Sequence, residues 1–227
     1  VRIADGTFVL TAGKDGIHSE NEDNEEKGYI YIADGDFTIT SDGDGMDASN
    51  IVQIEDGTFD ITVGGGAANS LKTHESDMPG GPGGGMPQNG ERPDGENMPQ
   101  DTTTGESGTS TKGIKAGGGM YLNGGTYQID SADDSIHSNA NITIADGTYT
   151  LATGDDGVHA DDALIVNGGT ITVTESYEGL EGLTVTINDG TIDITARDDG
   201  INAAGEKMEL NGGYIHILAG GDGMDSN

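Results

Sequence analysis

Acidic side chains recur at one position of a repeated motif, and this spacing suits the binding of a cation. In its fullest form the motif is Gly154–Ala160, with the sequence GDDGVHA. Alignment of its copies gives an acidic column and, three residues later, a polar column. The acidic column contains Asp15, Asp44, Lys112, Asp134, Asp156, Glu178, Asp199 and Asp222. The polar column contains His18, Asp47, Lys115, His137, His159, Glu181, Asn202 and Asp225, and doubled acids add Asp133, Asp155 and Asp198.

If the copies stack in space, each column becomes a row of carboxylates that repel one another. Two unit charges ~4.8 Å apart, the spacing of neighbouring strands, repel by about 0.9 kcal/mol in water and about four times more at an effective dielectric constant near 20. Summed over several copies, this repulsion is comparable with the net stability of a domain. Oxygen ligands without thiolates select a hard cation, and the adaptable coordination of Ca²⁺ suits ligands from neighbouring copies. The columns therefore predict calcium bound between repeats.

Acids on neighbouring copies are the predicted calcium ligands. The alternative is that Asp-Gly is a favoured turn dipeptide, in which each Asp caps backbone amides locally. That alternative accounts for any single Asp, whereas the whole column favours calcium. Neither a twelve-residue EF-hand loop nor a nine-residue calcium repeat is present. The predicted ligands are Asp133, Asp134, Asp155 and Asp156 as one group, Glu178, Glu181, Asp198 and Asp199 as a second, and Asp44 and Asp47.

Basic and imidazole side chains interrupt the columns. Lys112 and Lys115 lie in a single copy, where they would act as internal counter-ions. The alternative is that one of them abstracts the proton α to the carboxylate of a calcium-bound uronate, as β-elimination requires. Flanking acids raise the pKa of a lysine, whereas a base needs it lowered, so we predict no catalytic residue. His137 and His159 should face outward, either as metal or ligand contacts or as solvated polar positions.

Short strands are the elements that would position these columns. Turn glycines stand at positions 6, 35, 57, 125, 147, 169, 190 and 213. Their separations are 29, 22, 68, 22, 22, 21 and 23 residues, a step of about 22 that two long gaps interrupt. Each unit contains three short segments of alternating hydrophobic and polar residues, which is typical of strands. Three strands per unit predict an all-β fold, a right-handed single-stranded parallel β-helix of about eight coils of ~22 residues. An eight-stranded antiparallel barrel is the rival, but equal phase and identical turns in every unit favour parallel stacking.

Composition excludes several classes of partner. The chain has 41 acidic and 9 basic residues and a net charge of −32, which argues against binding to nucleic acid or to an anionic membrane surface. No run of about 18 apolar residues is present, so we expect no membrane insertion in this segment. The absence of cysteine excludes disulfides and thiolate metal sites. Because the sequence starts and ends inside a repeat, we expect a fragment whose signal peptide lies outside it.

One domain is predicted over residues 1–227, with an insertion at 67–110. Between Met78 and Pro87 this insertion consists of Gly, Pro and Met. It lacks periodic apolar residues, so we expect a flexible surface segment. The repeat resumes at Thr111.

Three forms of the motif carry a resemblance to a known family. They are D-D-G-[IV]-[HN]-[AS], the sequence SYEGLEG at Ser176–Gly182 and the sequence KGIKA at Lys112–Ala116. They resemble the extracellular carbohydrate-binding β-helix proteins of clostridia and related Firmicutes, which are similar in fold to family 9 pectate lyases. The resemblance covers every repeat except the insertion. It implies Ca²⁺ binding, affinity for acidic sugars such as polygalacturonate and for cellulose, and a location outside the cell or on its surface.

The aromatic content bears on which carbohydrate we expect the chain to bind. The chain has no Trp and few aromatic residues, most of them in the inward phase, so a flat platform for crystalline cellulose has little support. Tyr177 stands beside the acidic column, where it can stack on a sugar ring. We expect a non-catalytic, extracellular, calcium-dependent protein that binds acidic plant polysaccharide, with a calcium-dependent pectate lyase and a structural surface stalk or adhesin as alternatives. The predicted ligand contacts are Tyr177, His137, His159, Lys112 and Lys115.

Overall fold

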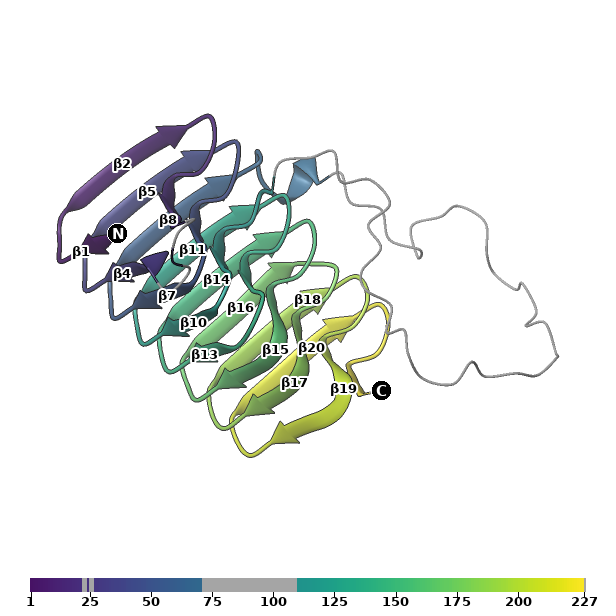
Figure 1. The fold of residues 1–227 in the computed structure, drawn as a ribbon. Coiled ribbons are helices and arrows are strands. Elements are labelled where there is room, and N and C mark those ends of the chain that lie inside the picture. The colour runs from purple at the N-terminus through teal and green to yellow at the C-terminus, as the bar shows by residue number, and fades with distance from the viewer. Residues whose placement is uncertain (22–23, 25–26, 71–109, 227) are drawn as a thin grey trace.

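The computed structural model describes residues 1–21, 24, 27–70 and 110–226, which wind into a right-handed parallel β-helix (Figure 1). The predicted fold class is confirmed. Residues 71–109, nearly all of the predicted insertion, lie outside the described residues, so its flexibility stays a prediction. Within the described ranges no helix has the length and hydropathy to cross a membrane.

One face of the solenoid is an eight-stranded parallel sheet with a strand from each predicted repeat. Although 62 residues separate Val63 from Thr126, the two strands that flank this gap pair in register, from Thr58 with Thr126 to Val63 with Ser131. The coil stack therefore continues across the insertion as predicted. The strands are β2 (Thr7–Ala12), β5 (Asp36–Ser41), β8 (Thr58–Val63), β11 (Thr126–Ser131), β14 (Thr148–Thr153), β16 (Thr170–Glu175), β18 (Thr191–Ala196) and β20 (Tyr214–Ala219).

A thirteen-stranded sheet forms the other two faces. In three coils the strands of both faces merge into one long strand, namely β15 (Val158–Val166), β17 (Leu180–Ile187) and β19 (Ile201–Leu210). The β15–β17 and β17–β19 pairings shift register between the two halves, which lets one strand turn from face to face. One face has β1 (Arg2–Ile3), β4 (Ile30–Ile32), β7 (Ile51–Ile54), β10 (Gly119–Leu122) and β13 (Ile142–Ile144), and the other β3 (Ile17–Ser19), β6 (Met46–Ala48), β9 (Ile114–Ala116), β12 (Ile136–Ser138) and β21 (Met224–Ser226).

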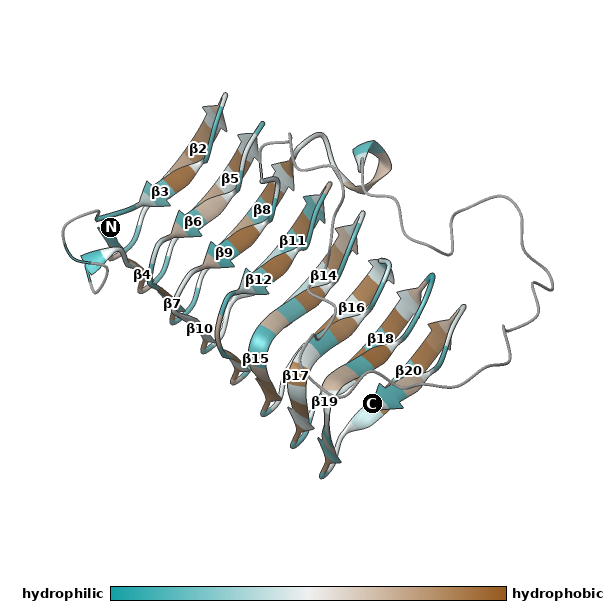
Figure 2. Cartoon of the chain, turned by 45° about the vertical axis from the view of Figure 1, so that its right-hand side comes forward, coloured by the Kyte–Doolittle hydropathy of each residue, from teal (hydrophilic) through white to brown (hydrophobic). Residues whose placement is uncertain are grey.

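The core is a set of rows of like side chains that run along the solenoid. Figure 2 shows hydrophobic bands at matching places in successive strands. Five aromatic rings stack in one row, with centroids 4.6–4.9 Å apart: Phe8, Phe37, Phe59, Tyr127 and Tyr149. The aliphatic residue between the acidic and polar columns is buried in the first seven coils, whereas Met224 at this position of the last described coil is 45% exposed. The buried residues are Ile17, Met46, Ile114, Ile136, Val158, Leu180 and Ile201.

Turn glycines allow the coils to approach closely. Gly57 has φ 133°, and a Cβ atom there would lie 2.8 Å from the carbonyl oxygen of Gly35 and 3.0 Å from the Phe59 ring. A residue with a side chain would therefore be strained in its backbone and would collide with the neighbouring coil. All the predicted turn glycines have positive φ: Gly6, Gly35, Gly57, Gly125, Gly147, Gly169, Gly190 and Gly213.

Both described ends of the insertion are attached to the solenoid. At the first end lies a short 3₁₀ helix, η2 (Ala67–Asn69), and the Ala67 amide donates to Oδ1 of Asp130 over 2.7 Å. At the second end the Ser110 hydroxyl donates to Oδ1 of Asp44 over 2.7 Å. The second attachment is therefore made to Asp44, a member of the acidic column.

Candidate functional site

The polar column is a continuous row across neighbouring strands. Its members are direct partners in the strand register, so side chains about 22 residues apart in sequence lie side by side. The partners run in the order His18, Asp47, Lys115, His137, His159, Glu181, Asn202 and Asp225.

The acidic column is held together by backbone hydrogen bonds between coils. The amide of the residue after each acidic position donates to the carbonyl of the acidic position in the next coil, as from Gly157 to Glu178 over 3.0 Å. Aspartates of this column add a second bond, because their Oδ1 atoms accept the next coil's amide. These bonds join Asp15 to Asp44 (2.9 Å), Asp44 to Lys112 (2.7 Å), Asp134 to Asp156 (3.2 Å), Asp156 to Glu178 (3.1 Å) and Asp199 to Asp222 (2.6 Å).

The alternative to a metal site was that each Asp only caps backbone amides of its own turn. The carboxylates of the acidic column also bond to the neighbouring coil. Local capping is found instead at the other turn of the coil, where Asp56 accepts the amide of Gly57 over 2.8 Å. Five aspartates of the acidic column thus bond to the next coil through Oδ1 and stabilise stacking. The second oxygen, Oδ2, contacts a lysine or histidine side chain in Asp15, Asp44, Asp134 and Asp156.

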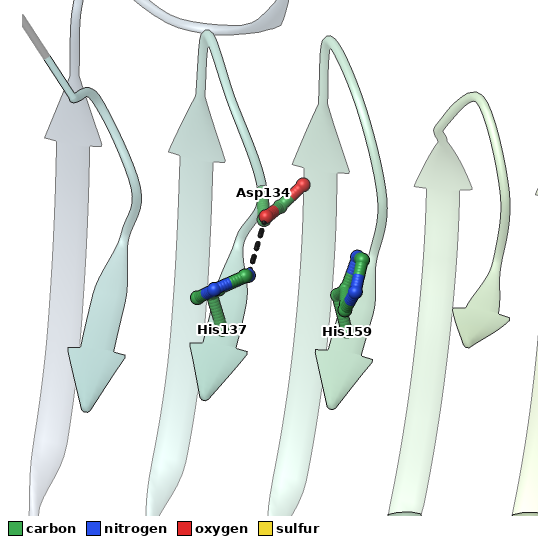
Figure 3. A group of neighbouring side chains, drawn as sticks. All are labelled: Asp134, His137 and His159. Atoms are coloured by element: carbon green, nitrogen blue, oxygen red, sulfur yellow. Dashed lines mark ion pairs between the residues drawn. The ribbon is translucent and has the colours of Figure 1, made fainter. Parts of the chain in front are cut away.

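Internal cations lie against the first predicted calcium group. The Nζ atom of Lys112 is 2.9 Å from Oδ2 of Asp133 and 2.8 Å from Oδ2 of Asp134. His137 places Nδ1 2.8 Å from the same Asp134 oxygen (Figure 3), at ion-pair distance although not aligned for a hydrogen bond. Burial would raise the pKa of Asp134, but the charge of Lys112 and the contact with His137 hold it well below its usual range.

Lys115, in the polar column of the same coil, also contacts two acids. Its Nζ atom is 3.6 Å from Oδ2 of Asp44 and 3.8 Å from Oδ1 of Asp47. Burial raises the pKa of Asp44, and the bonds from Lys112 and Ser110 partly offset this effect. Both lysines thus contact the acids of the columns that they interrupt, at the positions expected of counter-ions.

His159 joins the first predicted calcium group to the second. Its Nδ1 atom lies 3.2 Å from Oδ2 of Asp156 and 3.0 Å from Oε2 of Glu181, and Nε2 lies 3.4 Å from Oδ1 of Asp161. Burial would lower the pKa of His159, but these carboxylates raise it to about 12. The imidazole is therefore a charged member of the row at neutral pH.

In the part of the chain that the structure describes, compensation in the second group is limited to the contact of His159 with Glu181. The Asn202 amide nitrogen donates to Oε2 of Glu178 over 3.0 Å and to Oε1 of Glu181 over 3.3 Å, and its buried Oδ1 has no hydrogen-bond partner. Burial, followed by the charge of Asp156, raises the pKa of Glu178 to about 7 and that of Glu181 to about 9. Asp198 and Asp199 add further negative charge beside Glu178. Among the described residues no lysine or arginine pairs with these four acids.

The donor atoms of the second group fit a hard cation. Ligand atoms of Asp156, His159 and Glu181 lie within 4.8 Å of one another, and the Asn202 amide nitrogen links Glu181 to Glu178. Carboxylate oxygens are the ligands that Ca²⁺ prefers. A cation there would replace the proton that the raised pKa values favour. The first group fits less well, because Lys112 and His137 already contact Asp133 and Asp134.

Other predicted and unpredicted residues complete the site. Tyr177 lies half-buried beside the acidic column, and its backbone amide donates to the Asp155 carbonyl over 2.6 Å. Asn202 and Asp161 were not predicted as site residues. The place of Asn202 in the polar column was the available signal, but its bridge between two glutamates depends on side-chain reach across coils.

Comparison with known proteins identifies a family. A family model described as "Carbohydrate-binding domain-containing protein" matches residues 1–157, and a second match covers residues 151–227. The two matches together include the whole chain. Neither a search of curated proteins nor a search of solved structures finds a significant match.

Proposed function

Because the chain belongs to the family of carbohydrate-binding domain-containing proteins, we propose that it binds acidic polysaccharide outside the cell through Ca²⁺ held on its acidic column. Family membership assigns carbohydrate binding. The calcium dependence, the acidic ligand and the extracellular location are our proposal. One observation carries it: Glu178 and Glu181 are half-buried near Asp156 and are bridged by the Asn202 amide nitrogen, and His159 contacts Glu181.

Electrostatics explains why a cation would be part of the ligand site. The chain has a net charge of −32, so a polyuronate approaching it alone is repelled. Bound Ca²⁺ accepts six to eight oxygen ligands. The carboxylates of Asp156, Glu178 and Glu181 would supply some of them and leave positions for sugar carboxylates. In this arrangement the protein residues hold the ion and remove the local repulsion.

The non-catalytic form of this function is favoured over the lyase. A lyase of the type considered needs a lysine that accepts a proton from the uronate. Lys112 is instead held between two carboxylates, 2.9 and 2.8 Å away, and is poorly placed to accept one. We therefore infer binding without bond cleavage.

Retention on immobilised polygalacturonate tests the proposal. With Ca²⁺ present we expect retention, and excess EDTA should abolish it. The double variant Glu178→Gln/Glu181→Gln keeps the side-chain shape and removes both charges, so its affinity should fall at least about tenfold, a loss of about 1.4 kcal/mol. Glu209→Gln, an exposed glutamate on the other face, is the matched control and should bind as the unaltered protein does.

Two outcomes would contradict the proposal. Retention that persists unchanged in EDTA would remove the bridging cation. Unsaturated, ultraviolet-absorbing product accumulating from polygalacturonate, and lost in Lys112→Ala or Lys115→Ala, would favour the lyase.

A further inference from the structure

Outward tyrosines gather on the face formed by β4, β7 and β10, away from the acidic column. Tyr31 pairs with Gln53, and Gln53 pairs with Tyr121, so these three side chains form one row across neighbouring coils. Tyr29 lies two residues before Tyr31 on the same face. Tyr121 and Tyr29 are 44% and 43% exposed. We call Tyr29, Tyr31, Gln53 and Tyr121 the tyrosine row.

A shallow hollow accompanies the tyrosine row. It has a volume of about 320 Å³ and is lined by Tyr29, Tyr31, Gln53, Ile51 and Arg2 among others. Tyr121 does not line the hollow, which therefore lies beside Tyr31 and Gln53, while the row continues past it to Tyr121.

Neighbouring charges hold the row in place. The Arg2 guanidinium carbon is 5.4 Å from the centre of the Tyr31 ring, within the range of a cation–π contact. On the other side, Glu55 accepts hydrogen bonds from the amides of Gln53 (2.5 Å) and Asn123 (3.0 Å). Exposed aromatic surface thus stands beside polar groups of fixed orientation.

This combination matches the chemistry of a sugar chain. Pyranose rings have C–H faces that pack on aromatic rings and hydroxyl edges that bond to amides and carboxylates, and binding sites in general combine apolar surface with a few oriented polar groups. Strands are about 4.8 Å apart, close to the length of one sugar residue in an extended 1,4-linked chain. Tyr31 and Tyr121, two strands apart, would then contact alternate residues of a chain that runs along the solenoid.

We propose that the tyrosine row binds an extended, uncharged glycan without a metal ion. The ligand is uncharged because the net charge of −32 repels anionic chains, and the row offers Glu55 and no oxygen cluster for a bridging cation. This inference rests on the carbohydrate-binding function proposed above but uses other residues. The strands β4, β7 and β10 carry the row, whereas Glu178 and Glu181 precede or lie in β17.

Affinity electrophoresis in gels containing soluble glucomannan tests the row, with EDTA in every buffer. We expect the protein to be retarded, and Tyr31→Ala/Tyr121→Ala to weaken binding at least about tenfold. Tyr214→Ala removes a tyrosine that is 63% exposed on the eight-stranded sheet and should leave retardation unchanged. Tyr31→Phe/Tyr121→Phe keeps the rings and should retain most of the affinity. Dextran, whose chain is flexible and not extended, should give no retardation.

The outcomes separate this inference from the proposed function. Absence of retardation by glucomannan, or equal retardation of the Tyr→Ala double variant, would overturn the tyrosine row while leaving calcium-dependent retention on polygalacturonate intact. Glucomannan binding that disappears in EDTA, or in Glu178→Gln/Glu181→Gln, would place the neutral glycan at the acidic column and also overturn it. Thermal unfolding of each variant verifies that the fold is preserved.

Discussion

Asp134 in the acidic column and Glu181 in the polar column show how neighbouring residues decide whether a carboxyl group is ionised. Asp134 is 2% exposed, yet its oxygens contact the Lys112 ammonium and the Asp156 amide, and its pKa is lowered. Glu181 contacts His159 and Asn202, and burial beside Asp156 raises its pKa to about 9. The same repeated motif therefore places a lysine against the acid in one coil, and a histidine and an amide against the acid two coils further on.

Lys112→Ala should destabilise the metal-free protein strongly. The substitution leaves the buried Asp134 carboxylate without its nearest cation, a change that costs about 3–5 kcal/mol for buried pairs. Urea unfolding at neutral pH in EDTA measures it. Lys207→Ala removes an exposed lysine that is 3.2 Å from Glu209 and should change the free energy of unfolding by less than about 0.5 kcal/mol. Equal losses in the two variants would argue against Lys112 as a structural counter-ion.

The stability of the metal-free protein should fall as pH rises from 5 to 9. Unfolded glutamates ionise near pH 4.3, whereas Glu178 and Glu181 resist ionisation in the fold up to about pH 7 and about pH 9. Rising pH therefore favours the unfolded chain across this window. His159, with its raised pKa, adds a loss in the same direction above about pH 6.5.

Comparison with Glu178→Gln/Glu181→Gln isolates the glutamates. Thermal unfolding in EDTA at several pH values should show a shallower decline for this variant, because it no longer carries the two ionisations. Added Ca²⁺ should raise the unfolding temperature of the unaltered protein more at pH 8 than at pH 5. Parallel pH profiles of the two proteins would contradict the assignment.

At the scale of the element, the turn glycines and the aromatic row work together. Each turn glycine after Gly6 lies against the carbonyl of the previous turn glycine. In the coils from Gly6 to Gly147 an aromatic ring two positions later packs beside the glycine, and in the later coils an isoleucine occupies that position. Rings 4.9 Å apart, as between Phe37 and Phe59, therefore depend on the close approach at Gly57. Strand pairing and core packing are coupled at this point of every coil.

Gly57→Ala should destabilise the protein by about 1–3 kcal/mol from backbone strain alone. The new methyl group would also meet the Gly35 carbonyl oxygen at 2.8 Å. Chemical denaturation measures the loss. Gly223→Ala is the matched control, since a Cβ atom there meets nothing within 4 Å. A loss at Gly223 as large as that at Gly57 would show that turn geometry is not the cause.

At the scale of the whole molecule, stacking brings the acidic residues of successive coils close together, so their charges add up to a negative electrostatic potential along the solenoid. The chain has a net charge of −32, and most of its acidic residues lie in the described solenoid, where each coil contacts its neighbours, so repulsion between coils accumulates along the axis. Monovalent salt screens this repulsion at a distance. A divalent ion bound between coils would remove it locally and add a link between neighbouring repeats.

Calcium should therefore stabilise the protein beyond any effect of ionic strength. A site saturated at 100 times its dissociation constant contributes about 2.7 kcal/mol, which raises the unfolding temperature of a chain of this size by at least about 5 °C. CaCl₂ and NaCl at equal ionic strength should be compared by calorimetry. Equal shifts in the two salts would show that screening suffices and that no ion is bound.

The fold and the rows of aligned residues followed from the sequence alone. A period of about 22 residues with strand-like alternation means that equivalent positions become neighbours, so the columns from Asp15 to Asp222 and from His18 to Asp225 were predictable as rows. The reason is that parallel stacking preserves register from coil to coil. The eight turn glycines and the continuation of the coils across the insertion were predictable on the same ground.

Tertiary structure alone decided which acids are compensated and which tyrosines are exposed. Lys112 reaches Asp133 and Asp134 in the next coil, and Asn202 reaches back to Glu178 and Glu181. Tyr31 and Tyr121 form a row because Gln53 lies between them in register. Such contacts depend on side-chain length, direction and burial across coils, which a period in the sequence does not encode.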